Sequence, residues 1–280
     1  MREVTAQKII EAVSEMCISA NCLISKDIQC ALQAAERTED NPLGQGVLST
    51  LLTNADIAEE KMIPICQDTG MAVVFVEVGQ EVHLAGGGLE EAINAGVAKG
   101  YKEGYLRKSV VADPIARENT GDNTPAVIHC RIVPGDGLKI TVAPKGFGSE
   151  NMSALKMLKP SQGLEGVKNF VLETVTKAGP NPCPPIIVGV GVGGTMEKAA
   201  ILAKESLLRS VGARNENQFW AQVEEELLTA INALDIGPAG FGGRTTALAV
   251  HIKPYATHIA GLPVAVNIGC HVTRHAQREL

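Results

Sequence analysis

The chain has 280 residues, of which 45% are hydrophobic and 20% are charged, and its net charge at pH 7 is −6. This composition excludes intrinsic disorder as the main state, and the negative charge with only 3% aromatic residues argues against nucleic acid as a partner. No apolar run approaches the roughly 18 residues of a membrane span, and no signal core follows the charged start MREVTAQKII, so we expect a cytoplasmic protein with no membrane partner.

The first part of the chain is predicted to be helical. Apolar residues recur at helical spacing over residues 4–17, and further helices are expected near 26–37 and 46–58. We expect residues 1–60 to be a helical N-terminal region of one domain that covers 1–280, rather than an independent domain.

Beyond this region, strands and helices are both expected. The predicted strands are 71–78, 126–133, 138–144, 184–192, 246–255 and 262–269. The predicted helices are 89–105, 163–178, 196–211 and 215–234. The turn sequence PGDG at 134–137 predicts a hairpin between the strands on either side of it. The fold class is therefore α/β, with mixed sheets and flanking helices.

Four of the seven cysteines are interpreted as core residues. Cys17, Cys22 and Cys30 lie among apolar residues of the helical region, and Cys130 lies within a predicted strand. Disulfides are not expected in a chain without an export signal.

The other three cysteines, Cys66, Cys183 and Cys270, stand beside loops in the sequences PICQDTG, GPNPCPP and NIGCH. Prolines on both sides of Cys183 fix the backbone there, which suits a rigidly presented thiolate. Three thiolates suit a cubane iron–sulfur cluster with one iron left open, or an incomplete zinc site. Spacing alone leaves both open, because no CxxC pair is present.

A structural zinc site would use Cys270, His271 and His275, since HVTRH places two histidines four apart on one face of a predicted helix. A zincin is excluded, because Val272 stands where HExxH has its glutamate.

Three glycines, Gly189, Gly191 and Gly194, formally match the dinucleotide-binding pattern GxGxxG. The continuation does not match, because a second helix follows where a strand ending in an acidic residue is required. NAD binding is therefore not expected, although the loop has helix N–H groups to offer to a carboxylate or to cluster sulfides.

Polar residues near the loop cysteines are candidates for chemistry. Asp68 and Gln67 directly follow Cys66; a carboxylate there is either a proton carrier or an ordinary turn residue of DTG. Arg107, at the predicted end of a helix, either compensates the helix dipole or binds an anionic substrate. His258 lies in a further polar loop.

Six segments together resemble the class I, iron–sulfur-dependent fumarate hydratase family, in its α subunit or N-terminal half, and L-tartrate dehydratase α subunits share the pattern. The segments are CQDTG (66–70), DPIARENTGDNTPAVIH (113–129), KGFGSENMS (145–153), GPNPCPP (179–185), GVGVGGT (189–195) and NIGCHVTRHA (267–276).

The resemblance implies a [4Fe–4S] cluster bound by Cys66, Cys183 and Cys270. The fourth iron has no protein ligand in that family and acts as a Lewis acid on the substrate. Gln67 and Asp68 match substrate contacts of the family. We expect Asp68 to carry the acid–base role on this chain, alone or as one half of a pair with a residue of the partner.

Three further substrate contacts are implied at Arg107 in YLRKS, at Gly148 in KGFGS and at His258 before NIGCH. His258 is also a candidate catalytic residue by this match. Phe147 departs from the GGGS sequence often seen in the family, while Gly146 and Gly148 remain.

The resemblance further implies reversible hydration of fumarate, a small dicarboxylate, to (S)-malate. Single-chain members continue beyond the position of Leu280, so it implies a separate β subunit that carries the rest of the active site, in an α2β2 assembly. One alternative is the α subunit of L-tartrate dehydratase. An alternative from another class is a non-catalytic iron–sulfur or zinc-binding protein.

Overall fold

The computed structural model describes residues 2–280, which divide into two compact units. Unit 1 comprises 2–24, 55–147 and 274–280, and unit 2 comprises 25–54 and 148–273. The N-terminal 60 residues thus contribute to both units, and their place within one domain stays a prediction. No helix in the described part of the chain is both long and apolar enough to cross a membrane.

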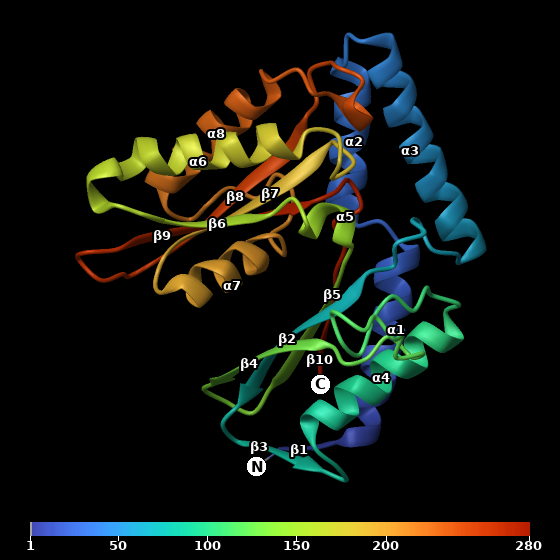
Figure 1. The fold of residues 1–280 in the computed structure, drawn as a ribbon. Coiled ribbons are helices and arrows are strands. Elements are labelled where there is room, and N and C mark those ends of the chain that lie inside the picture. Colours follow the sequence, from blue (N-terminus) through green and yellow to red (C-terminus); the bar gives the residue numbers. More distant parts are fainter. Residues whose placement is uncertain (1) are drawn as a thin grey trace. The chain divides into compact units, whose positions relative to one another are not determined.

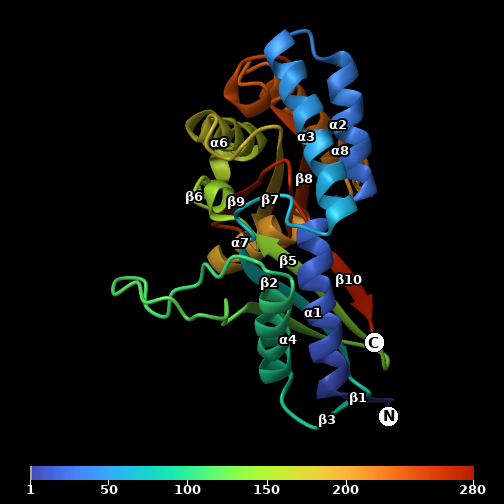
Figure 2. The ribbon, with the colours of Figure 1, turned by 90° about the vertical axis from the view of Figure 1, so that its right-hand side faces the viewer.

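Unit 1 is built on a four-stranded sheet with the strand order β10-β5-β2-β4 (Figure 1). Its strands are β2 (Met71–Gly79), β4 (Val127–Val133), β5 (Leu138–Lys145) and β10 (Ala276–Glu279). Helices α1 (Ala6–Cys22) and α4 (Leu89–Glu103) lie side by side (Figure 2), and both contribute to the core against the sheet. A parallel pair, β1 (Arg2–Thr5) and β3 (Val82–Ala85), completes the unit.

The predicted hairpin between β4 and β5 is wrong. Strand β2 lies between them, parallel to β4 and antiparallel to β5. The PGDG turn instead bonds to the end of β2, where the Gly79 N–H donates to the Gly137 carbonyl at 2.8 Å. Strand β2, which comes earlier in the chain, therefore lies between β4 and β5, where the turn sequence predicted that these two strands pair directly.

Unit 2 has a second four-stranded sheet, with the order β6-β9-β7-β8. Its strands are β6 (Ala154–Leu158), β7 (Ile186–Gly193), β8 (Ala247–Tyr255) and β9 (Leu262–Gly269). Helices α6 (Gly163–Ala178) and α8 (Gln218–Asn232) pack on one face of the sheet, and α7 (Met196–Ser206) packs on the other. The mixed sheets with flanking helices confirm the α/β class.

The remaining elements are short or belong to the N-terminal region. They are α2 (Lys26–Thr38), α3 (Pro42–Lys61), α5 (Phe147–Glu150) and the 3-10 turns η1 (Pro160–Gln162) and η2 (Pro238–Gly240). The sequence did not predict β1, β3, β6 or β10, each of which has four or five residues.

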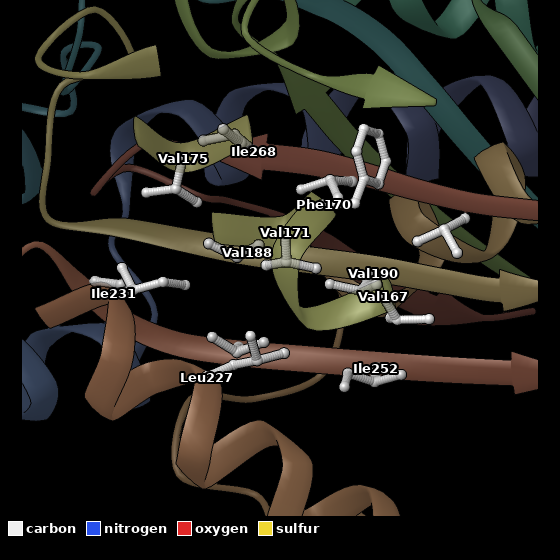
Figure 3. Packing of buried hydrophobic residues seen from close by; sticks show 14 of the residues in the cluster. Val167, Phe170, Val171, Val175, Val188, Val190, Leu227, Ile231, Ile252 and Ile268 are labelled. Atoms are coloured by element: carbon white, nitrogen blue, oxygen red, sulfur yellow. The ribbon is translucent and has the colours of Figure 1, made fainter. Parts of the chain in front are cut away.

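The main core of unit 2 lies between β7 and the two helices α6 and α8. Figure 3 shows Val171 of α6 and Leu227 and Ile231 of α8 gathered about Val188 and Val190 of β7. These side chains are buried, so they contribute to the hydrophobic stabilisation of this face.

The opposite face of β7 is made of glycine, because the strand alternates valine with glycine. A Cβ added at Gly191 would lie 2.1 Å from the Ala199 carbonyl oxygen, and one at Gly189 would lie 2.2 Å from that of Ala203. The glycines therefore let the backbone of α7 approach the strand. Helix–strand packing, rather than dinucleotide binding, explains the GxG part of the sequence pattern.

Two of the four cysteines predicted to be core residues are not. Cys17 and Cys22 are fully buried in α1, as expected. Cys30, on the outer side of α2, and Cys130, in the edge strand β4, are exposed. Their apolar neighbours in sequence did not reveal which side of each element faces solvent.

A buried histidine makes unit 2 sensitive to acid. His251 of β8 is 2% exposed, and its Nδ1 lies 3.1 Å from the Ser206 carbonyl oxygen. Burial lowers the pKa of His251 to about 4, and Arg209 acts in the same direction, while Ser206 and Asp27 oppose the shift. The ring is therefore neutral in the folded protein at pH 7.

We expect unit 2 to lose stability as the pH falls from about 6.5 to about 4, because His251 binds a proton in the unfolded chain before it does so in the folded one. The loss attributable to this residue is about 3 kcal/mol. Urea unfolding across this pH range should show a smaller pH dependence in His251→Gln. The exposed His83 provides the control, and an equal pH dependence in His83→Gln and His251→Gln would contradict the assignment.

Replacement of Gly191 by alanine should destabilise unit 2 by about 1–3 kcal/mol or more, since the new methyl group overlaps the backbone of α7. The measurement is urea unfolding followed by circular dichroism. Gly46 is the matched control: it lies in α3 with no atom within 4 Å of an added Cβ, so Gly46→Ala should stabilise by about 0.5–1 kcal/mol. Equal stability of the two variants would show that the strand tolerates the methyl group.

Candidate functional site

The CQDTG segment forms a turn of unit 1 that leads into β2. The Asp68 carboxylate accepts hydrogen bonds from the Gly70 N–H at 3.0 Å and from the Phe147 N–H at 2.8 Å. The Asp68 N–H in turn donates to Sγ of Cys66 at 3.4 Å. The turn therefore presents a thiol and a carboxylate from one backbone segment, with the carboxylate fixed from both oxygens.

Two buried side chains hold the turn from behind. The Tyr101 hydroxyl lies 2.7 Å from the Thr69 carbonyl oxygen and 3.0 Å from that of Gly70. The Asn123 amide donates to the same Gly70 carbonyl at 3.1 Å, and its oxygen accepts the Ser109 N–H at 2.7 Å. Burial raises the pKa of Tyr101, so its hydroxyl remains a donor at neutral pH. Neither Tyr101 nor Asn123 was predicted from the sequence, although Asn123 lies in the GDNTP part of segment 113–129.

Glycine is required where the turn meets the end of β5. Gly70 has φ +75°, and a Cβ there would lie 2.7 Å from the Lys145 carbonyl carbon. A Cβ at Gly146 would lie 3.2 Å from Oδ2 of Asp68. The two glycines thus allow the backbone to surround the Asp68 carboxylate closely.

Two other predicted substrate contacts lie at this turn. Gln67 is exposed, and Arg107 is joined to the turn because the Thr69 hydroxyl donates to the Arg107 carbonyl at 3.1 Å. The Arg107 side chain is exposed and lies beyond α4, which ends at Glu103. Arg107 therefore does not end a helix, and compensation of a helix dipole does not explain it.

In unit 2, the loops of Cys183 and Cys270 meet at one end of the sheet. Cys183 precedes β7, Cys270 follows β9, and these two strands are antiparallel. The His271 N–H donates to the Cys183 carbonyl at 3.5 Å, and Nδ1 of His271 lies 3.1 Å from the same oxygen. Cys183 has φ +56° and is exposed, whereas Cys270 is half-buried.

Two glycine-rich loops border the Cys183 loop. A Cβ added at Gly148 would lie 3.7 Å from the Asn181 carbonyl oxygen, so the GFGS loop lies beside this segment. The Ala239 N–H donates to the Pro184 carbonyl at 2.9 Å from the loop that contains GFGG. Gly148, Cys183 and Cys270 are therefore gathered within unit 2.

His258 is not gathered with them. It lies in the loop from β8 to β9, at the opposite end of β7 from Cys183, and it is exposed. The 8 residues of β7 span about 25 Å. Nδ1 of His258 accepts the Ala260 N–H at 3.2 Å. A role of this residue in contacting substrate stays a prediction.

The donor set fits an iron–sulfur cluster. All seven cysteines carry thiols outside disulfides, and sulfur is the ligand such clusters prefer. Sγ of Cys66 already accepts a backbone N–H, a contact that also stabilises sulfur in its anionic, iron-bound form. Neither unit, within residues 2–280, by itself gathers three His, Cys, Asp or Glu side chains able to hold one metal ion.

The helix that the zinc alternative required is not formed. Residues 271–275 form a turn and a loop without regular structure, so HVTRH does not place its two histidines on one helix face.

Comparison with known proteins identifies the family. The model of the fumarate hydratase (Fumerase) family matches residues 10–279. A putative L(+)-tartrate dehydratase subunit alpha of Methanocaldococcus jannaschii is 43% identical over 279 residues, which cover 98% of each chain. The L(+)-tartrate dehydratase subunits alpha of Escherichia coli K12 and Shigella boydii are each 32% identical, over 96% of this chain and 91% of theirs. The chain therefore belongs to the fumarate hydratase (Fumerase) family and is an enzyme of the hydro-lyase class.

Proposed function

We propose that this chain is the α subunit of an iron–sulfur hydro-lyase that reversibly hydrates fumarate to (S)-malate. The observation that carries the proposal is the Asp68 turn, in which a fixed carboxylate and a thiol lie two residues apart. A hydro-lyase needs an acid–base group that adds a proton to a substrate carbon or removes it. It also needs a Lewis acid beside that group, which polarises the hydroxyl group that leaves.

Asp68 is the residue we assign to proton transfer. In the direction of malate formation a proton is added to one alkene carbon while water supplies the hydroxyl group at the other. In the reverse direction the carboxylate removes that proton from carbon, and the hydroxyl takes up a proton from solvent as it leaves as water. Asp68 then returns its own proton to solvent, so that no net charge is gained or lost. The backbone N–H groups of Gly70 and Phe147 bind the Asp68 carboxylate and fix its orientation. This lowers the entropy that is lost when the carboxylate is oriented for proton transfer.

Cys66, Cys183 and Cys270 are the residues we assign to a [4Fe–4S] cluster. When bound, this cluster supplies an iron without a protein ligand as the Lewis acid for substrate oxygens. Gln67, Arg107, Gly148 and His258 are proposed to contact the substrate.

A separate β subunit is part of the proposal. The relatives that match along nearly the whole chain are named as alpha subunits, which suggests a partner for this chain too. We propose that the partner supplies the remaining cationic groups for the dicarboxylate, in an α2β2 assembly. Such groups stabilise the negative charge that develops as the proton leaves carbon.

The second candidate substrate is L(+)-tartrate. The names of the relatives favour it, since they are called tartrate dehydratases at 32–43% identity. Tartrate and malate differ by one hydroxyl group, so the same proton transfer and the same loss of water serve both substrates.

Anaerobic reconstitution with iron and sulfide, alone and with the candidate β subunit, tests the function. We expect loss of fumarate absorbance at 240 nm only when both subunits and the cluster are present. L(+)-tartrate is tested in parallel by formation of oxaloacetate. Turnover of tartrate without fumarate would replace the first candidate by the second, and turnover of neither would refute both.

Cysteine variants provide the matched control for cluster binding. Serine at Cys66, Cys183 or Cys270 should reduce bound iron and sulfide. Serine at the exposed Cys30 or Cys130 should leave both unchanged. Zinc bound without iron or sulfide would favour a non-catalytic zinc protein.

Asp68→Asn should lower kcat by about 10²–10⁴ at equal iron content, because an amide cannot accept the proton. Asp136, an exposed carboxylate of the PGDG turn in the same unit, is the control, and Asp136→Asn should retain turnover. Full turnover of Asp68→Asn with an intact cluster would remove Asp68 from the mechanism.

A further inference from the structure

Arg274, four residues after Cys270, is a buried cation attached to the Asp68 turn. Its side chain belongs to unit 1, and the residue is 7% exposed. Nη2 of Arg274 donates a hydrogen bond to the backbone carbonyl of Asp68. Its Nε is buried and has no acceptor among residues 2–280.

The charge of Arg274 also lacks a carboxylate partner. Five other arginines form ion pairs with aspartate or glutamate: Arg131, Arg209, Arg214, Arg244 and Arg278. No Asp or Glu oxygen of the described chain lies within 4.0 Å of the Arg274 guanidinium. A buried guanidinium with an open donor is costly unless an anion or further acceptors accompany it.

The groups that face Arg274 do not supply that anion. It interacts electrostatically with Tyr101 and Cys22, whose pKa values are both raised by burial, so both are neutral at pH 7. The Asp68 carboxylate accepts the N–H groups of Gly70 and Phe147 and forms no ion pair with Arg274. Arg274 therefore has a positive charge and a free donor to offer to a further anion at the turn that carries Cys66.

We propose that Arg274 is a positioning residue for the Asp68 turn and that its charge compensates the anionic cluster held by Cys66. This inference rests on the proposed cluster but on neither proposed substrate. Three thiolates outweigh the positive charge of an oxidised [4Fe–4S] core, so the liganded cluster is an anion. Arg274 holds the carbonyl of the same residue whose N–H donates to the Cys66 sulfur.

Two measurable effects distinguish the proposed role of Arg274 from a general contribution to the stability of the fold. Reduction adds an electron to the cluster, so a nearby cation favours the reduced form and raises the midpoint potential. Loss of the bond to the Asp68 carbonyl should also loosen the turn and expose Cys66 more often in the protein without its cluster.

The test compares Arg274→Gln, Arg274→Lys and the control Arg278→Gln in the full chain. Arg278 lies on the same C-terminal segment but pairs with Glu15 at 2.6 Å and is accessible to solvent. After anaerobic reconstitution, a redox titration followed by electron paramagnetic resonance should give a more negative midpoint potential for Arg274→Gln only. Arg274→Lys, which keeps the charge, should remain near the wild-type value.

Amide hydrogen exchange of the cluster-free protein, followed by mass spectrometry, provides a readout without iron. Residues 66–70 should exchange about tenfold faster in Arg274→Gln, while helix α6 of the same molecules should exchange at the wild-type rate. This readout stands even where the glutamine variant takes up no cluster.

Wild-type potential and wild-type hydrogen exchange of residues 66–70 in Arg274→Gln would overturn the inference while leaving the hydro-lyase proposal intact. A shifted potential in a protein that turns over neither fumarate nor tartrate would support Arg274 and refute the substrate assignment. Equal shifts in Arg274→Gln and Arg274→Lys would refute charge compensation.

Discussion

The hydrogen bonds to the Asp68 carboxylate are the constraint on which the site in unit 1 depends. One comes from Gly70, within the same turn, and the other comes from Phe147, beyond the end of β5. They join two segments that are distant in sequence, and they require close backbone approach at Gly70 and Gly146. The thiol of Cys66 is bonded to the same turn, so the candidate ligand and the candidate acid–base group are fixed together.

Glycine serves two different purposes in this chain. At Gly70 it lets the turn approach the Lys145 backbone, and at Gly146 it gives room beside the Asp68 carboxylate, which are requirements of the site. At Gly189 and Gly191 it gives room for a helix against a strand, which is a requirement of the fold. The sequence alone does not separate these uses, because both appear as short glycine-rich stretches beside strands. The separation depends on which backbone approaches each glycine.

Local patterns predicted the elements well and their neighbours poorly. Helix α6 and strand β9 have the predicted bounds, since α6 has helical periodicity, β9 is a short and mostly apolar run, and each ends beside a glycine. The hairpin across 134–137 failed because no local signal reveals an inserted strand. For the site, adjacency in sequence predicted that Cys66 and Asp68 belong together. The contact of Arg274 with Asp68 spans 206 residues, so only the fold reveals it.

The edges of the two sheets have a consequence for how the chain behaves before any partner binds. Strands β4 and β6 each stand at the end of a sheet, with one row of backbone groups that no neighbouring strand uses. Arg131 in β4 and Lys156 in β6 are exposed there, and Pro134 and Pro160 follow soon after each strand. Charge and proline are the features that discourage strand-by-strand growth between copies. These residues therefore disfavour pairing between the edge strands of two copies of the chain, although β4 and β6 remain edge strands.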